Sequence, residues 1–492
     1  MKGKFKPWQR WVLFALAMAV IFASGVIISF LMEHSAEVVN VDYKKKIKIN
    51  GIEARSIIFA ENYPREYKTW VDTTSTDLHS RLNGRTSIDV LAQRPEMVIL
   101  WAGYAFSKDY STPRGHMYAL QDIVHSLRTG APMGGADGPQ FASCWVCKSS
   151  DVPRMIEAIG VDSFYNNKWA AWGAEIVNPI GCADCHEPKN MDLHISRPSL
   201  TEAFSRQGRD ITHATPQEMR SLVCAQCHSE YYFKGNIKYP TFPWDKGFTV
   251  EDLEKYYDEI GFTDYIHKLS RAPILKAQHP DYEIFKMGIH AQRGVSCADC
   301  HMPYNDEGGI KYSDHHIQNP LALTERTCQT CHRDNKETLC KNVYERQQKA
   351  NELRTLLEKE LAKAHIEAKF TWDIGATENE MQEALLLIRQ AQWRWDFGVS
   401  SHGGSFHAPQ ETMRILGHGL NKVFQARMLI SKVLVAHGYT DNVPLPDITT
   451  KEKAQQYIGL DMAVEKADKD KFLKEIVPEW LQKAKANGRI VN

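Results

Sequence analysis

The stretch Cys182-Ala183-Asp184-Cys185-His186 places two cysteines two residues apart, followed at once by a histidine. Two thiols at this spacing can form thioethers with the vinyl groups on one edge of a porphyrin, and the adjacent imidazole can then bind the iron, so C-x-x-C-H is typical of c-type haem attachment. The pattern recurs three times, which predicts four covalent haems with four proximal histidines. The other copies are Cys224-Ala225-Gln226-Cys227-His228, Cys297-Ala298-Asp299-Cys300-His301 and Cys328-Gln329-Thr330-Cys331-His332.

A fifth pair, Cys144-Trp145-Val146-Cys147-Lys148, ends in lysine instead of histidine. Lysine binds a metal only when it is neutral, and its deprotonation at pH 7 costs roughly 4–5 kcal/mol from a reference pKa near 10.4. Histidine supplies a neutral nitrogen at little cost near pH 7, so a haem that only transfers electrons does not need lysine. The pattern therefore predicts a fifth, catalytic haem with an open distal position. A haem site lost in evolution, or a pair unrelated to haem, is the alternative.

The same cysteines could in principle hold zinc or form disulfides. Neither chemistry requires a histidine directly after the second cysteine in four separate motifs, so both are less economical explanations than haem. The eleventh cysteine, Cys340, belongs to no pair and is expected to be an ordinary thiol.

The N-terminal sequence predicts a membrane anchor. Lys2, Lys4, Lys6 and Arg10 precede an uncharged run from Trp11 to Met32, which as a helix would span roughly 33 Å, enough for a bilayer. Basic residues before such a span hold the N-terminus in the cytoplasm and place the rest of the chain in the periplasm. A cleaved signal peptide would export the chain to the same compartment.

The remaining chain falls into two regions, and together they predict a mainly α multihaem cytochrome c fold. Residues 1–35 form the anchor or signal, 36–340 a loop-rich region that packs around haems, and 341–492 a region of long helices that completes the haem core.

Lys+Arg and Asp+Glu number 60 each, so nothing indicates nucleic-acid binding. Residues 451–474 are expected to form a solvated helix face, and Trp393 and Trp395 to be core or interface packing. The expected long helices cover 343–370, 379–399, 411–437 and 450–488.

The lysine motif together with four C-x-x-C-H motifs closely resembles cytochrome c nitrite reductase, the pentahaem, ammonia-forming enzyme. The resemblance covers nearly the whole chain after the anchor. Its other signatures are Cys224-Ala225-Gln226-Cys227-His228-Ser229-Glu230-Tyr231-Tyr232-Phe233, Leu275-Lys276-Ala277-Gln278-His279-Pro280, Ala391-Gln392-Trp393-Arg394-Trp395-Asp396 and His407-Ala408-Pro409.

The resemblance implies a periplasmic enzyme with five haem c groups that reduces nitrite to ammonium at the Lys148 haem, with Arg128, Tyr231 and His279 around the substrate. It also implies one Ca²⁺ beside this site. The calcium ligands would be the Glu230 carboxylate, the carbonyl oxygens of Tyr231 and Lys276, and the Gln278 side chain, since calcium prefers oxygen ligands.

The same resemblance implies distal histidines for the four other haems and partners for the whole protein. Electrons would come from a membrane tetrahaem quinol dehydrogenase or another periplasmic donor, and long helices would form a homodimer. His402, His365 and His316 are competing ligands, while His194, His213 and His418 are expected to be ordinary polar positions. The implied distal ligands are His315 for the Cys182/Cys185 haem, His116 for Cys224/Cys227, His407 for Cys297/Cys300 and His290 for Cys328/Cys331.

Two other functions remain open from the residues alone. A pure electron carrier would need neither the lysine ligand nor an open iron. A related multihaem reductase could act mainly on hydroxylamine, sulfite or tetrathionate.

Overall fold

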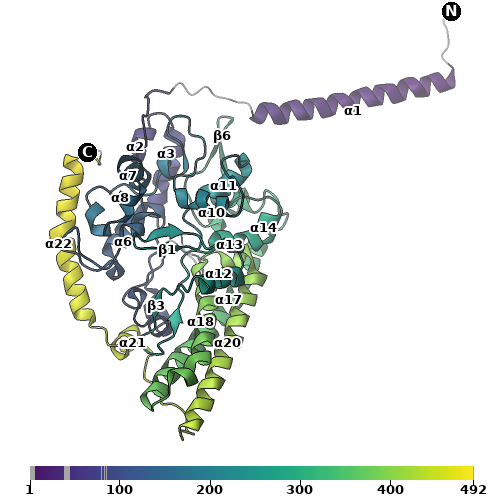
Figure 1. Ribbon diagram of the computed structural model, residues 1–492. Coiled ribbons are helices and arrows are strands. Elements are labelled where there is room, and N and C mark those ends of the chain that lie inside the picture. The colour runs from purple at the N-terminus through teal and green to yellow at the C-terminus, as the bar shows by residue number, and fades with distance from the viewer. Residues whose placement is uncertain (1–5, 38–44, 79, 83, 85, 491–492) are drawn as a thin grey trace, which may run out of the picture.

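The computed structural model describes residues 6–37, 45–78, 80–82, 84 and 86–490. The predicted mainly α architecture is confirmed: helices and loops make up most of the chain (Figure 1). In the described residues the strands form three antiparallel hairpins. These are β1–β2 (Tyr232–Lys234, Tyr239–Thr241), β3–β4 (Tyr265–Ile266, Pro273–Ile274) and β5–β6 (Tyr304–Glu307, Ile310–Ser313).

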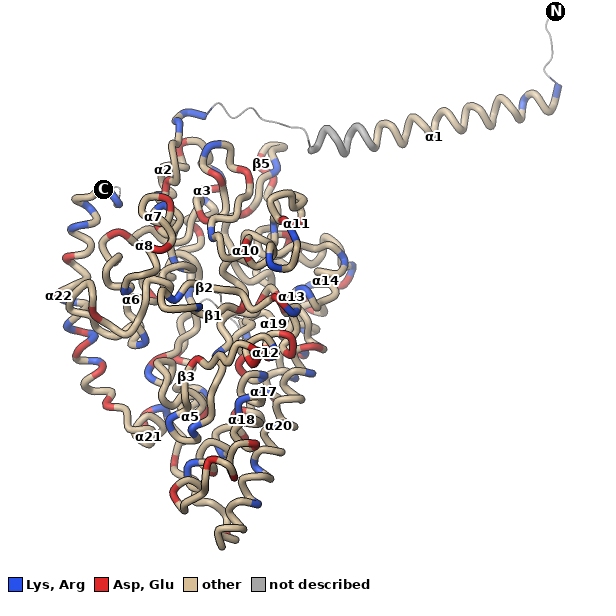
Figure 2. Tube along the Cα trace, in the orientation of Figure 1, with Lys and Arg blue, Asp and Glu red and all other residues tan. Residues whose placement is uncertain are grey.

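Helix α1 (Pro7–Glu37) projects away from the body of the molecule (Figure 1). Its segment Pro7–Ser29 has a mean hydropathy of 2.6 and is long and apolar enough to cross a membrane, with none of it buried against the rest of the chain. In Figure 2 the described part of this helix carries charge only near its start, whereas basic and acidic residues are both spread over the body. Lys6 and Arg10 supply that charge. Lys2 and Lys4, the other predicted flanking cations, lie outside the described residues.

Residues 45–335 form short helices joined by long loops, as expected for the predicted haem-packing region. The α-helices here are α2 (Ser56–Phe59), α3 (Pro64–Val71), α4 (Val90–Gln93), α5 (Glu96–Leu100), α6 (Ala119–His125), α7 (Asp151–Ile159), α8 (Val161–Tyr165), α9 (Cys182–Cys185), α10 (Pro198–Arg206), α11 (Pro216–Ala225), α12 (Val250–Glu259), α13 (Asp281–Met287), α14 (Ile289–Gln292), α15 (Cys297–His301) and α16 (Thr324–Thr327). Single 3₁₀ turns are η1 (Asp72–Thr74), η2 (Ala105–Ser107), η3 (His116–Tyr118), η4 (Leu127–Thr129), η5 (Ala142–Trp145), η6 (Trp169–Trp172) and η7 (Pro320–Leu323).

Two of the cysteine motifs begin short helices, and the aspartate within each motif caps its own helix. The Asp184 carboxylate accepts a hydrogen bond of 2.7 Å from the Gly181 N–H at the start of α9. Asp299 accepts an equivalent bond of 2.7 Å from the Ser296 N–H at α15. Such bonds satisfy donors that a helix start leaves unpaired. The aspartate inside each motif therefore helps to hold the local backbone of that motif.

Three long helices pack side by side at one end of the molecule (Figure 1) and carry the largest apolar core. They are α17 (Lys336–Asp373), α18 (Glu378–Ser400) and α20 (Pro409–Ala436), joined to the haem region by the short α19 (Gly404–His407). The first begins at Lys336, ahead of the predicted boundary at 341. Trp393 and Trp395 are fully buried, as predicted.

The expected long helix over 450–488 is wrong. The structure has α21 (Lys451–Tyr457) and α22 (Met462–Ala486) instead. The break arises because Ile458 is buried in the core, Gly459 takes a left-handed φ of +70°, and Asp461 then caps α22 through the Ala463 and Val464 N–H groups. A left-handed residue is favourable mainly for glycine and ends a helix.

Helix α22 runs along the edge of the molecule opposite the long bundle (Figure 1). The predicted solvated face over 451–474 holds for most of its residues but not for Lys469, which is buried. The Lys469 amine donates to the Val124 carbonyl at 2.9 Å, the Thr129 hydroxyl at 3.1 Å and the Gly130 carbonyl at 2.6 Å. The C-terminal helix thus holds the segment that contains Arg128.

His365, one of the competing ligands, is a core residue of α17. Its ring stacks on His267 with centroids 3.6 Å apart, and its nitrogens lie 2.9 Å from the Ser270 hydroxyl and 2.6 Å from the Gln392 side-chain oxygen. Burial lowers the pKa of His365 to about 4. Both nitrogens therefore have protein partners, and the ring is neutral at physiological pH.

We expect His365→Gln to weaken the acid sensitivity of the fold. The unfolded chain protonates His365 near its ordinary pKa of about 6.5 and the folded chain only near 4, so this histidine makes stability fall as pH drops between those values. Urea unfolding at pH 7 and pH 4.5 should show that the wild type loses about 2–3 kcal/mol more than the variant over this interval.

The matched control is His213→Gln, which replaces an exposed histidine. Its stability should follow the wild type at both pH values. Equal acid sensitivity in the wild type and His365→Gln would contradict the neutral buried state of this ring.

Candidate functional site

One cavity of about 2010 Å³ runs through the haem region and collects nearly all of the predicted site residues. This volume is well above the roughly 300–1,000 Å³ of an ordinary small-molecule pocket, so it can hold several large groups. Lys148, Arg128, Tyr231, Gln278 and His279 line it together. The predicted attachment cysteines on its wall are Cys144, Cys147, Cys182, Cys185, Cys224, Cys227, Cys297, Cys300 and Cys328. The tenth, Cys331, is exposed.

The cysteines are all free thiols. No two of these cysteines are joined by a disulfide in the structure. Within the described residues, the cluster of three possible metal ligands consists of His279, Asp281 and His402 and contains no cysteine. The cysteines are thus not gathered into the four-ligand sites that structural zinc requires.

The rings of the four predicted pairs of haem histidines lie close to each other, and all of these histidines except His332 line the cavity. Two imidazoles that bind one metal ion from opposite sides, each at about 2 Å, have ring centres roughly 6 Å apart. The spacing fits four iron sites without movement of the backbone. The ring-centre distances are 6.1 Å for His186–His315, 6.1 Å for His116–His228, 6.3 Å for His301–His407 and 6.3 Å for His290–His332.

Backbone carbonyls orient several of these rings. The Nδ1 atom of His186 lies 2.7 Å from the Met191 carbonyl, and that of His315 lies 2.9 Å from the Ser313 carbonyl. A carbonyl only accepts, so Nδ1 carries the proton and Nε2 keeps its lone pair for a metal. Burial also lowers the pKa of His186 to about 4, which keeps the ring neutral.

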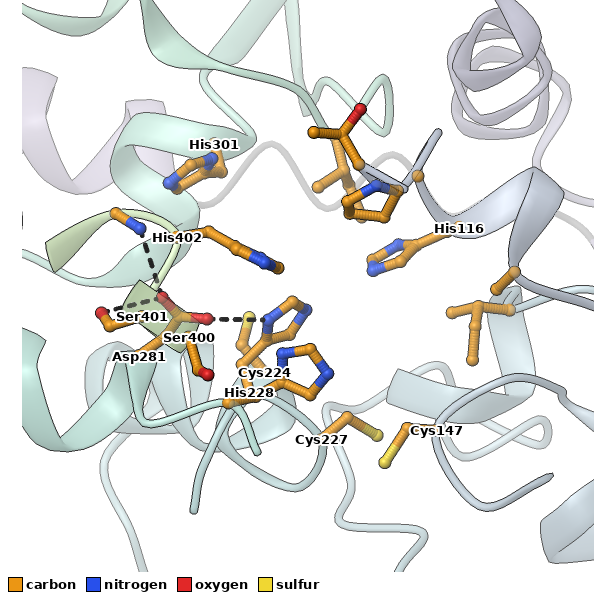
Figure 3. A pocket seen from close by; sticks show the side chains of 18 of the residues that line it. His116, Cys147, Cys224, Cys227, His228, Asp281, His301, Ser400, Ser401 and His402 are labelled. Atoms are coloured by element: carbon orange, nitrogen blue, oxygen red, sulfur yellow. Dashed lines mark hydrogen bonds and ion pairs between the residues drawn. The ribbon is translucent and has the colours of Figure 1, made fainter. Parts of the chain in front are cut away.

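Asp281 is a residue that the sequence reasoning missed. Its carboxylate lies 3.6 Å from Nδ1 of His228 and accepts hydrogen bonds from the Ser401 hydroxyl and the Gly403 N–H (Figure 3). A carboxylate at this nitrogen leaves Nε2 of His228 for a metal. Asp281 lies only two residues after His279 in the sequence, and this closeness to a predicted site residue could have indicated its role.

Of the other competing histidines, His402 lines the cavity, with its ring 5.5 Å from that of His279. His316 is not on the cavity wall, and its Nδ1 lies 3.2 Å from the Gln318 amide nitrogen. The three histidines expected to be ordinary polar positions, His194, His213 and His418, are exposed.

The lysine motif lies on a tight turn that a tryptophan pair supports. The Lys148 N–H donates to the Trp145 carbonyl at 2.9 Å. Trp145 is buried, and its indole N–H donates to the Trp169 carbonyl at 2.8 Å. In turn the Trp169 indole donates to the Thr129 carbonyl at 3.2 Å, next to Arg128. The turn with Lys148 and the turn with Arg128 are therefore joined through two buried indoles.

Three residues of different chemistry share the cavity wall with Lys148. The Arg128 guanidinium bonds the Ser126 hydroxyl at 3.0 Å and lies 4.4 Å from the centre of the Phe106 ring, so it is held while its remaining donors stay available. Burial, followed by the nearby His402 and Lys148 charges, lowers the pKa of His279 well below its usual value. Burial raises the pKa of Tyr231 well above its usual value. A fixed cation, a neutral imidazole and a phenol can bind an anion and supply hydrogen bonds to it.

Beside these residues lies a buried carboxylate without a cationic partner among the described residues. Glu230 is fully buried, and its oxygens accept the Tyr257 hydroxyl at 2.9 Å and the Gln278 N–H at 2.6 Å. The Gln278 side chain in turn lies 3.2 Å from the Lys276 carbonyl oxygen. Burial raises the pKa of Glu230 well above its usual value. Three of the predicted ligand residues, Glu230, Lys276 and Gln278, therefore lie together, and a bound cation would offset the cost of burying this charge.

Two further carboxyl groups lie beside Glu230 and Lys276. The Glu283 carboxylate accepts the Glu230 N–H at 2.8 Å, and burial raises its pKa to about 8. Asp264 accepts the Lys276 N–H at 2.8 Å, and burial raises its pKa to about 7. The Lys276 amine is paired with Asp396 at 2.9 Å and does not reach Glu230 as an ion pair. These residues fit a site for a divalent cation.

Comparison with known proteins is consistent with this geometry. Residues 56–488 match the family model described as cytochrome c552. Curated relatives named cytochrome c-552 include one from Bacteroides fragilis, 72% identical over 100% of this chain and 99% of that protein, and one from Porphyromonas gingivalis, 63% identical over 99% and 98%. The solved cytochrome c nitrite reductase from Desulfovibrio desulfuricans, described with two calcium sites in its catalytic subunit, is 28% identical with a TM-score of 0.73. That match covers 85% of this chain and 91% of that one.

Proposed function

Since this chain belongs to the cytochrome c552 family and is a multihaem cytochrome c nitrite reductase, an oxidoreductase, we propose that it reduces nitrite to ammonium at a haem whose proximal ligand is Lys148. The proposal rests on a difference between the five cysteine motifs. Four have a second imidazole facing their own histidine at 6.1–6.3 Å. The fifth has a lysine and shares its cavity wall with Arg128, Tyr231 and His279.

Five haem c groups would be held by the ten paired cysteines. Their axial ligands would be Lys148 and the four histidine pairs His186/His315, His228/His116, His301/His407 and His332/His290. When bound, these groups would relay electrons, and the group held at Lys148 would supply the iron that reacts with substrate. A second histidine at each of the other four would suit those sites to electron transfer.

The side chains around Lys148 supply what the reaction needs besides electrons. Conversion of nitrite to ammonium and two waters takes up six electrons and eight protons. Arg128 keeps its charge at any physiological pH and would bind the nitrite anion and orient it. His279, neutral in its buried position, would donate a hydrogen bond to a substrate oxygen and pass protons. Tyr231 would donate a hydrogen bond from its phenol.

A calcium ion at Glu230 would fix two of these side chains. Its ligands would be the Glu230 carboxylate, the Tyr231 and Lys276 carbonyl oxygens and the Gln278 side chain. Tyr231 and His279 are the direct sequence neighbours of these ligands. The burial of the Glu230 carboxylate, with no cationic partner among the described residues, supports this assignment.

The proposed location is the periplasmic face of the cytoplasmic membrane, with α1 as an anchor or a removed signal. The long apolar segment Pro7–Ser29 supports export by either route. A membrane tetrahaem quinol dehydrogenase or another periplasmic carrier would supply electrons. The long helices α17, α18 and α20 would form a homodimer.

We expect Lys148→His to reduce nitrite-dependent ammonium production by about 100-fold, because replacement of the ligand alters the iron that binds substrate. Purified protein with reduced viologen as electron donor gives the rate, and ammonium is measured directly. The control is Lys189→His, an exposed lysine close to another haem motif, which should keep the wild-type rate.

Equal activity of Lys148→His and the wild type would contradict a special lysine haem. Five low-spin haems with no nitrite turnover in the wild type would instead favour a pure electron carrier. Steady-state rates with hydroxylamine, sulfite and tetrathionate separate the related reductase activities.

We expect Glu230→Gln to abolish calcium binding, because it removes the anionic ligand while keeping the size of the side chain. Metal analysis after dialysis against a chelator should find one calcium per wild-type chain and none in the variant. The control is Glu283→Gln: with a pKa of about 8 this carboxyl is mostly protonated at pH 7, so an amide preserves its charge. Retained calcium in Glu230→Gln, or its loss from Glu283→Gln, would be inconsistent with this site.

A further inference from the structure

A single arginine, Arg197, lies fully buried where three of the cysteine motifs meet. It precedes helix α10 and belongs to none of the motifs. Burial alone would lower the pKa of Arg197, but the neighbouring Asp184 carboxylate raises it, so the guanidinium keeps its charge. An arginine in this environment requires partners for all of its donors.

Its strongest set of contacts is with the lysine motif. The Arg197 Nε and Nη2 atoms both donate to the Val146 carbonyl, at 3.1 and 3.0 Å. Nη2 also donates to the Ser149 carbonyl at 2.9 Å. Val146 and Ser149 lie on either side of Cys147 and Lys148. The guanidinium therefore bridges the two ends of the short backbone segment that presents the lysine.

The same arginine contacts the internal residues of two histidine motifs. Its Nη2 forms an ion pair of 2.5 Å with Asp184, inside the motif that ends at His186. Its backbone N–H donates at 3.1 Å to the side-chain oxygen of Gln226, inside the motif that ends at His228. The Gln226 amide then donates to the Asp184 carbonyl at 2.7 Å, which closes the network.

We propose that Arg197 is a positioning residue that holds the Lys148 backbone in register with the two neighbouring haem motifs. The proposal rests on the proposed function in taking Lys148 as the ligand of the catalytic haem. Arginine suits this role because its planar fork bonds several carbonyls in fixed directions, whereas a lysine ammonium acts as a point charge on a flexible stem. Partners that orient a metal ligand typically change affinity or activity by about 10–100-fold when they are removed.

The test compares Arg197→Lys and Arg197→Met with a matched control. Arg197→Lys keeps the positive charge beside Asp184 but removes the planar guanidinium that bonds several carbonyls at once. The control is Arg394→Lys, because Arg394 is equally buried and pairs with Glu254 at 3.0 Å, far along the chain from the cysteine motifs. Attached haems are counted by intact mass, the lysine haem is followed by its high-spin EPR signal, and kcat and KM are measured with nitrite.

We expect five attached haems in Arg197→Lys, a changed high-spin signal, and a kcat lower by about tenfold or more with an unchanged KM. In Arg197→Met we expect the haem at Cys144 and Cys147 to be lost or altered selectively. Arg394→Lys should keep the wild-type signal and kcat. A variant that only lowered the overall stability would not change the spectrum of one haem. This pattern therefore distinguishes a role in positioning Lys148 from a role in general stability.

Wild-type EPR signals and kcat in both Arg197 variants would overturn the proposal. Loss of the whole protein in both variants would assign Arg197 to general stability and overturn it as well. A wild type that makes no ammonium would overturn the proposed function instead, and the spectrum of its lysine haem would still report on Arg197.

Discussion

Paired imidazoles about 6 Å apart are the constraint on which the haem region depends. Each pair must come from separate segments, because one ring follows a cysteine motif and the other faces it across a wide space. His116 in η3, His290 in α14, His315 after β6 and His407 at the end of α19 meet this requirement from four different places. Long irregular loops between short helices are the geometric consequence, since regular elements packed directly on one another would close the space. The long helices at the other end carry the largest apolar core, and two smaller apolar cores lie mainly within the haem region.

Electrostatic balance is the second constraint on the site. Arg128 brings positive charge to the cavity wall, while Glu230, the sequence neighbour of Tyr231 on that wall, is fully buried. Burial of unpaired carboxylates is costly unless they are protonated or bind a cation. A cation at Glu230 would therefore stabilise the fold as well as assist the reaction. It would keep the Glu230–Gln278 contact closed and fix the backbone that carries Tyr231 and His279.

The sequence predicted those features that depend on local pattern. The C-x-x-C-H motifs, the long helices around Leu361 and Ile388, and the buried Trp393 and Trp395 all follow from spacing and composition. The distal histidines came from a family resemblance, because the spacing of sixteen other histidines in the chain does not say which ring faces which. The break at Gly459 was missed because the polar pattern continues across it. Lys469 was missed because one buried lysine on a charged helix has no local signal.

The tertiary contacts that matter most to the site are also those that no local pattern reveals. Arg197 is one arginine among many in the sequence, yet it bonds the carbonyls on both sides of Cys147 and Lys148 and pairs with Asp184. A histidine ligand needs little help, since its ring is rigid and its second nitrogen can be fixed by a carbonyl, as at His186. A lysine has a flexible stem and no second nitrogen, so the only way to direct its amine is to hold its backbone. The lysine-ended motif therefore requires a stronger contact from outside itself than the histidine motifs do, and the buried Arg197 guanidinium, which also pairs with Asp184 of one histidine motif, would provide it.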